Sequence, residues 1–126
     1  MPTGRHSSGA VHIPAIGDLV IGGYSGDHLR TVELLQAAGE VGDSNRVWKN
    51  ISCTIKPRWE PSAVYFNENV IVVSMWDNTV EILSLAGGQI GQWTLLSECH
   101  TPSNRTSSIC AYDGRIFISS KLQAEV

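Results

Sequence analysis

The stretch GDLVIGGYSGDHLRTVELL, residues 17–35, places two adjacent glycines at the end of an apolar run. Gly22 and Gly23 follow that run, and a second apolar run after a polar bend carries a single acid, Glu33. Glycine at the end of a strand costs conformational entropy and offers no side chain to the core. A single occurrence is typical of a β-bulge. A pattern that returns elsewhere in the chain indicates a repeat instead.

The surrounding pattern does return. Three segments begin with arginine and run into small and apolar residues: RHSSGAV at Arg5, RWEPSAV at Arg58 and RTSSICA at Arg105. Each is followed, after a turn-like patch, by an apolar run, at residues 19–21, 71–73 and 116–118. The chain therefore contains an internal repeat of two full copies and the beginning of a third.

The agreement continues downstream of the apolar runs. TVELL, which contains Glu33, matches TVEIL, which contains Glu81, and a tryptophan follows each. Trp48 and Trp93 are 45 residues apart, and 52 residues separate Leu19 from the matching Ile71. The repeat period is thus about fifty residues, with one longer loop.

Within one unit, runs of Val, Ile, Tyr, Phe and Thr alternate with patches of Gly, Asp, Asn and Ser, which favours strands over helices. We expect ten strands, four in each of two units and two in a third, at residues 8–12, 18–23, 30–35, 46–50, 61–66, 69–74, 79–84, 92–96, 107–111 and 114–119. The segment LLQAAGE, residues 34–40, could extend as a short helix, but Gly39 and Gly42 close it quickly and predict a loop.

This order of residues resembles the kelch repeat. In that repeat an arginine and small residues enter a first strand, a second strand ends in Gly-Gly, a third carries Val-Glu and a fourth carries tryptophan. The matching residues are Arg5, Gly22, Gly23, Glu33 and Trp48 in the first unit and Arg58, Glu81 and Trp93 in the second. The resemblance covers nearly the whole chain, although Ser74-Met75 and Ser119-Ser120 replace the double glycine in the later units.

The resemblance implies an all-β fold made of four-stranded antiparallel blades of a kelch-type β-propeller. Residues 1–56 are expected to form the first blade, residues 57–101 the second, and residues 102–126 the start of a third. Propellers typically hold about four to eight blades. We therefore expect an incomplete propeller of about two and a half blades, either a fragment of a longer protein or the product of a truncated gene model.

The composition excludes several classes of function. The 126 residues are 42% hydrophobic and 17% charged, with a net charge of −3 and no basic stripe, so nucleic-acid binding is not expected. Apolar runs such as residues 70–73 are far shorter than the roughly 20 residues of a membrane helix. Residues 1–10 lack the apolar segment of a signal peptide, which predicts a cytoplasmic protein. Glycosylation tripeptides at Asn50 and Asn104 leave secretion as an alternative.

The residues that carry chemistry form no recognisable site. Three cysteines (Cys53, Cys99 and Cys110) have no C-x-x-C spacing, and four histidines (His6, His12, His28 and His100) are scattered. The motif G-x-S-x-G is absent, and GGYSG lacks the lysine and helix of a phosphate loop. We expect no catalytic residue, no metal and no cofactor.

Aromatic and basic residues near predicted turns indicate a protein-binding surface, because exposed aromatic and arginine side chains favour such contacts. The candidate partner-binding residues are Arg5, Tyr24, Arg58, Trp59, Trp76 and Arg105. Two alternatives stay open. The aromatic side chains could instead cover the junctions between blades, and the arginines could instead anchor strand starts through carbonyl groups or through Glu33 and Glu81.

The resemblance also implies a non-catalytic function. Many kelch propellers belong to BTB-kelch proteins, which act as substrate adaptors of cullin-based ubiquitin ligases, so the resemblance implies a module that binds a ubiquitin ligase substrate through loops between strands. An actin-binding kelch protein of the cytoskeleton is the first alternative. A propeller-based enzyme such as a secreted oxidase is the second, and it would need copper ligands or acid and base residues that converge at the axis.

Overall fold

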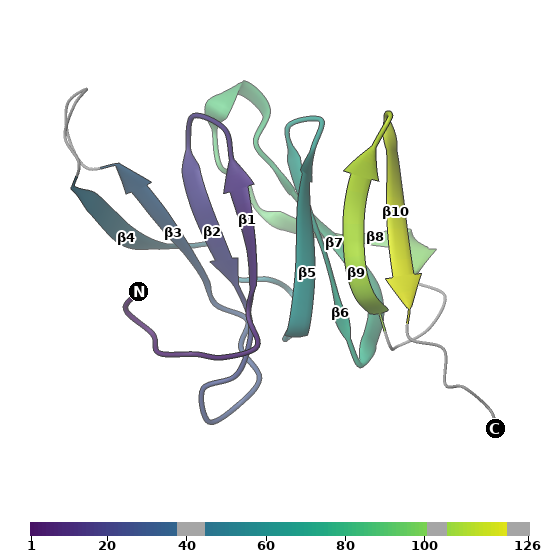
Figure 1. The fold of residues 1–126 in the computed structure, drawn as a ribbon, viewed down its shortest axis with the longest axis horizontal. Helices are drawn as coiled ribbons and strands as arrows, with labels where there is room; N and C mark the ends of the chain where they lie inside the picture. The colour runs from purple at the N-terminus through teal and green to yellow at the C-terminus, as the bar shows by residue number, and fades with distance from the viewer. Residues whose placement is uncertain (38–44, 101–105, 121–126) are drawn as a thin grey trace.

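The structure, a computed structural model, describes residues 1–37, 45–100 and 106–120, and its strands form three antiparallel sheets (Figure 1). The first sheet has the order β1 (Gly9–Ile13), β2 (Gly17–Ile21), β3 (Val32–Ala37), β4 (Arg46–Ile51). The second has the order β5 (Trp59–Phe66), β6 (Asn69–Met75), β7 (Asp77–Ser84), β8 (Trp93–His100), with a 3-10 turn, η1 (Ala86–Gly88), between its last two strands. The third pairs β9 (Thr106–Tyr112) with β10 (Arg115–Ser120). The predicted all-β class of two four-stranded sheets and a partial third is confirmed.

The strand bounds agree with the predicted ones to within about two residues, except at the end of β8. Strand β8 continues to His100 instead of ending near residue 96. Strand β3 continues to Ala37, where Gln36 pairs with Val47 and Ala37 with Arg46. Residues 34 and 35 belong to the strand, as the predicted strand at 30–35 requires, and the predicted loop is wrong for Gln36 and Ala37, because cross-strand pairing with β4 extends the strand. Residues 38–40 and Gly42 lie outside the described residues.

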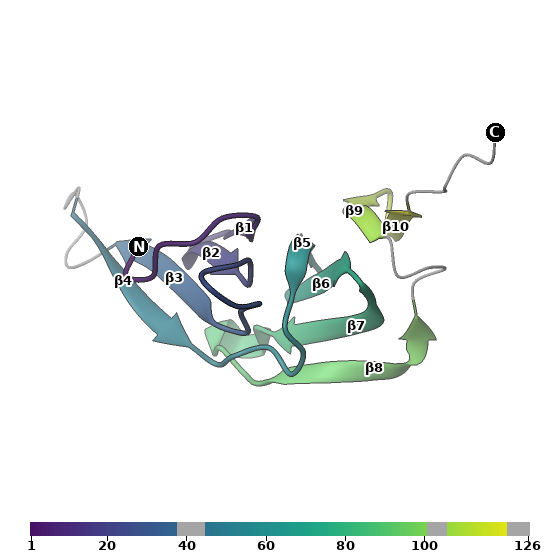
Figure 2. The ribbon, with the colours of Figure 1, turned by 90° about the horizontal axis from the view of Figure 1, so that it is seen from below.

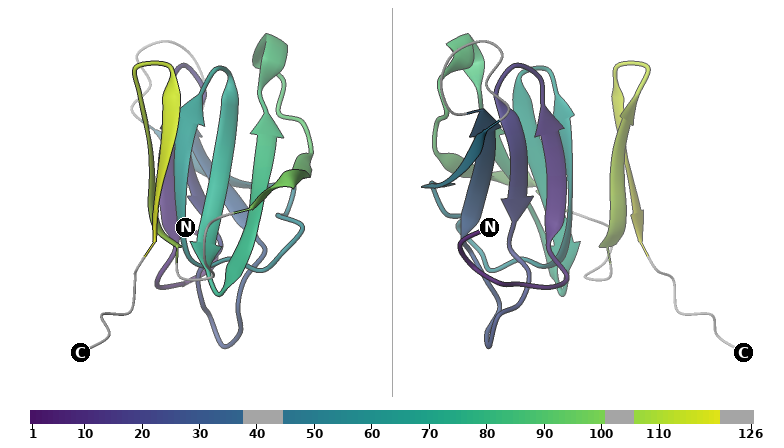
Figure 3. Two further views of the ribbon diagram at one scale, coloured as in Figure 1. Left: turned by 90° about the vertical axis from the view of Figure 1, so that its right-hand side faces the viewer. Right: turned by 60° about the vertical axis from the view of Figure 1, so that its left-hand side comes forward.

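The first strands of the three sheets lie side by side, and each sheet extends away from them strand by strand (Figures 1 and 2). In Figures 1 and 3 the inner strands β1, β5 and β9 run along one common axis, whereas the outer strands β4 and β8 are turned away from it, so the three twisted sheets lie next to one another and do not close into a barrel. Gly9 of β1 lies directly against β5, because a Cβ atom built on it would stand 2.7 Å from the carbonyl oxygen of Pro61. The two inner strands therefore meet backbone to backbone.

The second sheet is covered on both faces by its neighbours. Val70 and Val72 of β6 belong to a core shared with Leu19, Ile21 and other residues of the first sheet. The alternate residues Ile71 and Val73 belong to a second core, which is completed by Ile109 of the third sheet. Because successive side chains of a strand point to opposite faces, an uninterrupted apolar run suits a strand that is buried on both sides.

The first and second sheets share the same register around the glutamate and tryptophan positions, although the second sheet also has register shifts between its strands. Leu35 pairs with Trp48, and Leu83 pairs with Trp93. Trp93 is 5% exposed, lies in the core between the two sheets, and donates a hydrogen bond from Nε1 to the carbonyl of Ser52 at 2.9 Å. Trp48 occupies the same register position on the outer face of the first sheet and is half-buried. Trp93 thus connects the second sheet to the chain segment that follows β4 of the first sheet.

The double glycine at the end of β2 contacts the backbone at the start of the second sheet. Gly22 and Gly23 have φ values of +61° and +96°, which favour glycine. The N–H of Gly23 donates to the carbonyl of Arg58 at 2.9 Å, and a Cβ atom on Gly22 would lie 2.6 Å from the same oxygen. The entropy cost of two glycines is therefore offset by a backbone contact between the sheets that no other residue permits.

We expect Gly22→Ala to destabilise the chain by about 3 kcal/mol, because it adds a collision with the backbone of Arg58 to the cost of a positive φ. Gly26→Ala is the matched control, since Gly26 has a φ of +76° but no atom within 4 Å of an added Cβ. It is expected to cost about 1 kcal/mol. Urea unfolding of both variants measures the difference, and equal losses would show that the contact with Arg58 contributes nothing.

Candidate functional site

A fully buried arginine lies at the start of the second sheet. The side chain of Arg58 is 0% exposed and its Nε and Nη2 donate to Oε2 of Glu81 at 2.8 and 2.5 Å. Its Nη1 donates to Oγ of Ser74 at 3.2 Å and to the carbonyl of Thr79 at 3.0 Å, and Nη2 also donates to Oγ1 of Thr79 at 3.2 Å. Every nitrogen of the guanidinium thus has an acceptor, which is the condition under which a buried charge is tolerated.

The carboxylate of Glu81 also holds the segment that connects the first and second sheets. The backbone N–H of Ile55 donates to Oε1 at 2.5 Å, and that of Lys56 donates to Oε2 at 3.2 Å. The preceding residue, Thr54, is buried, and its Oγ1 lies 2.8 Å from the carbonyl oxygen of Lys56 and 3.2 Å from that of Arg30, so its single hydroxyl hydrogen is shared between the two carbonyls. The connection is therefore fixed at both of its sides by hydrogen bonds to buried groups.

The first sheet contains the corresponding pair with fewer hydrogen bonds. Nη2 of Arg5 lies 3.2 Å from Oε2 of Glu33, and both side chains are 0% exposed. Nη1 of Arg5 donates to the carbonyls of Gly22 and Thr31, each at 3.0 Å, and the N–H of Thr3 donates to Oε1 of Glu33 at 3.1 Å. The ion pair lacks the alignment of a hydrogen bond, and within the described residues Nε of Arg5 and Oγ1 of Thr31 have no hydrogen-bond partner. The double glycine supplies no hydroxyl where the second sheet has Ser74.

The sequence predicts Arg5 and Arg58 as partner-binding residues at the surface, and these contacts place both side chains in the interior instead. Both guanidinium groups are buried against a glutamate, so neither side chain reaches solvent. The alternative role as an anchor of a strand start, bonded to carbonyl groups and to Glu33 or Glu81, is the one that the structure contains. Arg105 lies outside the described residues.

We expect Glu81→Gln to destabilise the chain by about 3–5 kcal/mol, because it leaves the Arg58 charge buried without a counter-ion. Glu33→Gln is the matched variant in the first sheet. It should cost less, about 1–3 kcal/mol, because the Arg5–Glu33 pair is poorly aligned. Chemical denaturation gives both values, and a loss at Glu33 equal to that at Glu81 contradicts the difference in geometry.

Asp77 caps the turn that leads into β7. Its Oδ1 accepts the N–H of Thr79 at 2.7 Å and also the hydroxyl of Thr79. Partial burial raises the pKa of this carboxyl, but the Thr79 hydrogen bonds and the charges of Arg58 and Lys56 together bring the pKa below its ordinary value of 3.8. A lowered pKa in the folded state means that the ionised carboxylate stabilises the fold.

We expect this contribution of Asp77 to be fully present above about pH 4 and to disappear as the pH falls through its lowered pKa. Asp77→Asn removes the titrating group. The free energy of unfolding of the parent chain should therefore exceed that of the variant near neutral pH, and the two should converge in acid. Denaturation curves across the acid range test this, and a difference that stays constant with pH refutes it.

An aromatic cluster of four residues, His6, Tyr24, His28 and Trp59, lies at the end of the first two sheets where β2 leads into β3 and β5 begins. The ring of His28 stacks on Trp59 with centroids 5.0 Å apart, and Tyr24 meets Trp59 edge to face at 5.6 Å. His6 contacts Tyr24 at 5.4 Å and Trp59 at 6.1 Å. Tyr24 and Trp59 are half-buried, whereas both histidines are exposed. The two histidines therefore form the exposed part of the cluster.

Trp76 lies at the same end of the molecule, in the turn between β6 and β7 (Figure 1). It is 56% exposed and has a φ of +66°. Of the aromatic residues predicted to bind a partner, Trp76 is thus exposed, while Tyr24 and Trp59 partly cover the junction of the first two sheets. Sequence reasoning missed His6 and His28. The isolated β-bridges that pair Tyr24 with both histidines bring them together, and no spacing rule reveals such bridges.

Other kinds of site are not evident in the part of the chain that the structure describes. No group of three or more His, Cys, Asp or Glu residues there could hold a metal ion. Within the same residues, no helix has the length and apolar character to cross a membrane. Cys53 and Cys110 are free and exposed.

No protein-family model matches the chain, and a search of curated proteins found no match.

Proposed function

We propose that this chain is part of a kelch-type β-propeller that binds a protein partner without catalysis. The observation that carries the proposal is the gathering of Tyr24, Trp59 and Trp76, with His6 and His28, at one end of the stacked sheets. Rigid aromatic side chains bury a large area at a small entropic cost, which is the reason that they dominate the energetics of protein interfaces. The strands below them supply a rigid support.

The repeated geometry supports the kelch assignment. Two units share the register of the Glu–Val and Trp–Leu pairs and the burial of an arginine against the Val-Glu glutamate. These are the positions at which the sequence resembles the kelch repeat. The finer proposal, that the partner is a substrate of a cullin-based ubiquitin ligase, rests on the resemblance to BTB-kelch proteins and places the protein in the cytoplasm.

The test compares two exposed aromatic residues at opposite ends of the sheets. Trp76→Ala removes the side chain at the proposed binding end, and Tyr112→Ala removes a side chain that is 76% exposed beside the β9–β10 turn. Proteins captured from a cell extract by the full chain are identified by mass spectrometry, and the purified candidate is then titrated against each variant. We expect Trp76→Ala to weaken binding about tenfold or more and Tyr112→Ala to leave it nearly unchanged.

The binding measurements test the proposed surface, and the identity of the captured partner tests the adaptor role. Equal binding by all three chains, or equal loss in both variants, overturns the proposed surface. If a cullin co-precipitates with the protein from cells, the adaptor role is supported. If the protein co-sediments with actin filaments and no cullin co-precipitates, the adaptor role is overturned and the protein-binding proposal stands.

A further inference from the structure

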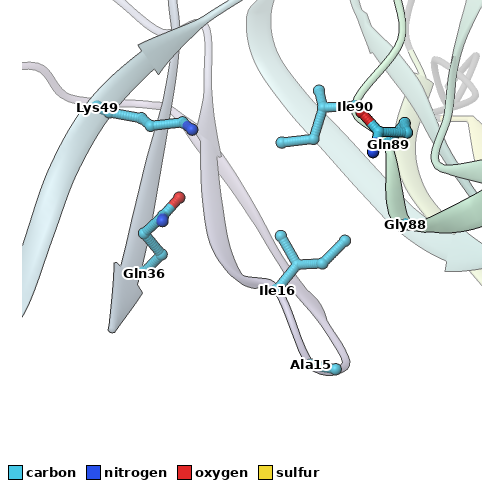
Figure 4. A pocket seen from close by; sticks show the side chains of 7 residues that line it. All are labelled: Ala15, Ile16, Gln36, Lys49, Gly88, Gln89 and Ile90. Carbon is cyan, nitrogen blue, oxygen red and sulfur yellow. The ribbon is translucent and has the colours of Figure 1, made fainter. Parts of the chain in front are cut away.

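A cavity of about 460 Å³ opens at the other end of the junction between the first two sheets. It is bounded by Ile16 in the β1–β2 turn, by Gln36 of β3 and Lys49 of β4, and by Gln89 and Ile90 after η1 (Figure 4). Its size is within the range of about 300–1,000 Å³ that is common for ligand pockets. It lies away from the aromatic cluster, so nothing in the proposed function accounts for it.

The polar side of the cavity is built by cross-strand pairing. Gln36 pairs with Val47, and Lys49 stands two residues further along β4, so Gln36 and Lys49 are diagonal neighbours on one face. That face is the one from which Leu34 enters the core shared with the second sheet. Figure 4 shows both side chains extending into the same space. The exposed Lys49 and the amide of Gln36 thus lie on the same side of the cavity.

Lys49 supplies the charge of this site. It is the one charged residue among the described residues that line the cavity, and within them its ammonium has no hydrogen bond or ion pair. The side-chain amide of Gln36 likewise makes no hydrogen bond to a described residue. An unpaired cation next to an amide is complementary to an anion with several acceptor oxygens, such as a carboxylate.

The opposite side of the cavity is aliphatic. Ile16 and Ile90 pack against the core between the sheets and also line the cavity, and Figure 4 shows both side chains directed into it. A ligand that fills the space must therefore combine a carboxylate with an aliphatic group a few bonds away. The last residue of a peptide has this form, because its carboxylate and its side chain branch from one carbon atom.

We propose that this cavity binds the C-terminal residue of a peptide with an aliphatic side chain. The terminal carboxylate pairs with Lys49 and accepts a hydrogen bond from the Gln36 amide, and the side chain lies between Ile16 and Ile90. An aspartate or glutamate within a peptide fits less well, because its carboxylate is separated from any aliphatic neighbour by the backbone. This proposal does not depend on the function proposed for the aromatic end.

The experiment titrates the full chain with three small probes while the methyl signals of Ile16 and Ile90 are followed by NMR. Acetyl-leucine carries the terminal carboxylate, acetyl-leucine amide lacks the charge, and acetyl-leucyl-glutamate amide moves the carboxylate to a side chain. We expect saturable shifts with acetyl-leucine, with a dissociation constant in the millimolar range as befits so small a ligand, and binding of the other two that is at least about fivefold weaker.

The matched variants are Lys49→Gln and Lys56→Gln, since Lys56 is an exposed lysine in the connection between the sheets, remote from the cavity. Lys49→Gln should reduce the affinity for acetyl-leucine to that for its amide, and Lys56→Gln should leave it unchanged. Dimethylated Lys49 in the parent chain gives a second signal that does not rely on a substitution, and it should shift with the carboxylate probe alone.

Several results would overturn the proposal. Equal affinity for acetyl-leucine and its amide would show that the carboxylate charge does not contribute to binding. An equal loss of affinity in both lysine variants would show that Lys49 has no specific role. A higher affinity for acetyl-leucyl-glutamate amide than for acetyl-leucine would show that the cavity prefers a side-chain carboxylate to a terminal one. Shifts that avoid Ile16 and Ile90 place the ligand elsewhere, whatever partner the aromatic end binds.

Discussion

The buried carboxylate of Glu81 is the group on which the junction of the first two sheets depends. It accepts hydrogen bonds from Arg58, the residue before the inner strand β5, and from the backbone of Ile55 and Lys56 in the connection. A carboxylate in an apolar interior is unfavourable unless such donors converge on it. The Arg58 guanidinium in turn donates hydrogen bonds to Ser74 of β6 and Thr79 of β7, on the two sides of the turn between these strands. Inner strand, turn and connection are thus tied to one charge pair.

The same arrangement explains the placement of the glycines. The carbonyl of Arg58 is the acceptor for the N–H of Gly23, so the residue whose side chain organises the second sheet also holds the end of β2 in the first. A side chain at Gly22 would push this backbone away and disturb the burial of the guanidinium behind it. The double glycine of the first unit is therefore held in place by Arg58 of the second, in keeping with stacked repeat units, each of which is stabilised by contacts with its neighbours.

Much of this fold is predictable from the sequence. Apolar runs and Gly, Asp and Asn patches place ten strands, and the matching TVELL and TVEIL segments take the same register because a slip of one residue would turn Glu81 and Leu83 to the opposite face of the sheet. The full burial of Arg5 and Arg58 is less accessible. An arginine at the start of a strand can lie in solvent or in the interior. Its burial here depends on the glutamate, Glu33 or Glu81, that a later strand of the same sheet places beside it.

The candidate sites depend on contacts between segments far apart in the chain, which local patterns do not encode. His28 stacks on Trp59 across the junction of two sheets, and the cavity brings Ile90 of the second sheet opposite Lys49 of the first. Periodicity gives the face on which each side chain lies but not the distance between sheets. That distance follows from the contact of Gly9 with Pro61, where two inner strands meet without an intervening side chain.

The outer face of the first sheet shows how one repeat can differ from another at the same register. In the second sheet Tyr65 pairs with Val70, and both pack in the core between sheets, whereas the matching pair in the first sheet is His12 and Asp18. His12 bonds Asp18 at 2.6 Å, and this bond, aided by the charge of Arg46, lowers the pKa of the Asp18 carboxyl. Asp18 also pairs with Leu35, and Leu35 pairs with Trp48, so a single cross-strand row of this face combines charged groups with two half-buried apolar side chains. The repeat therefore preserves the polar clusters that organise each sheet more strictly than the faces between sheets.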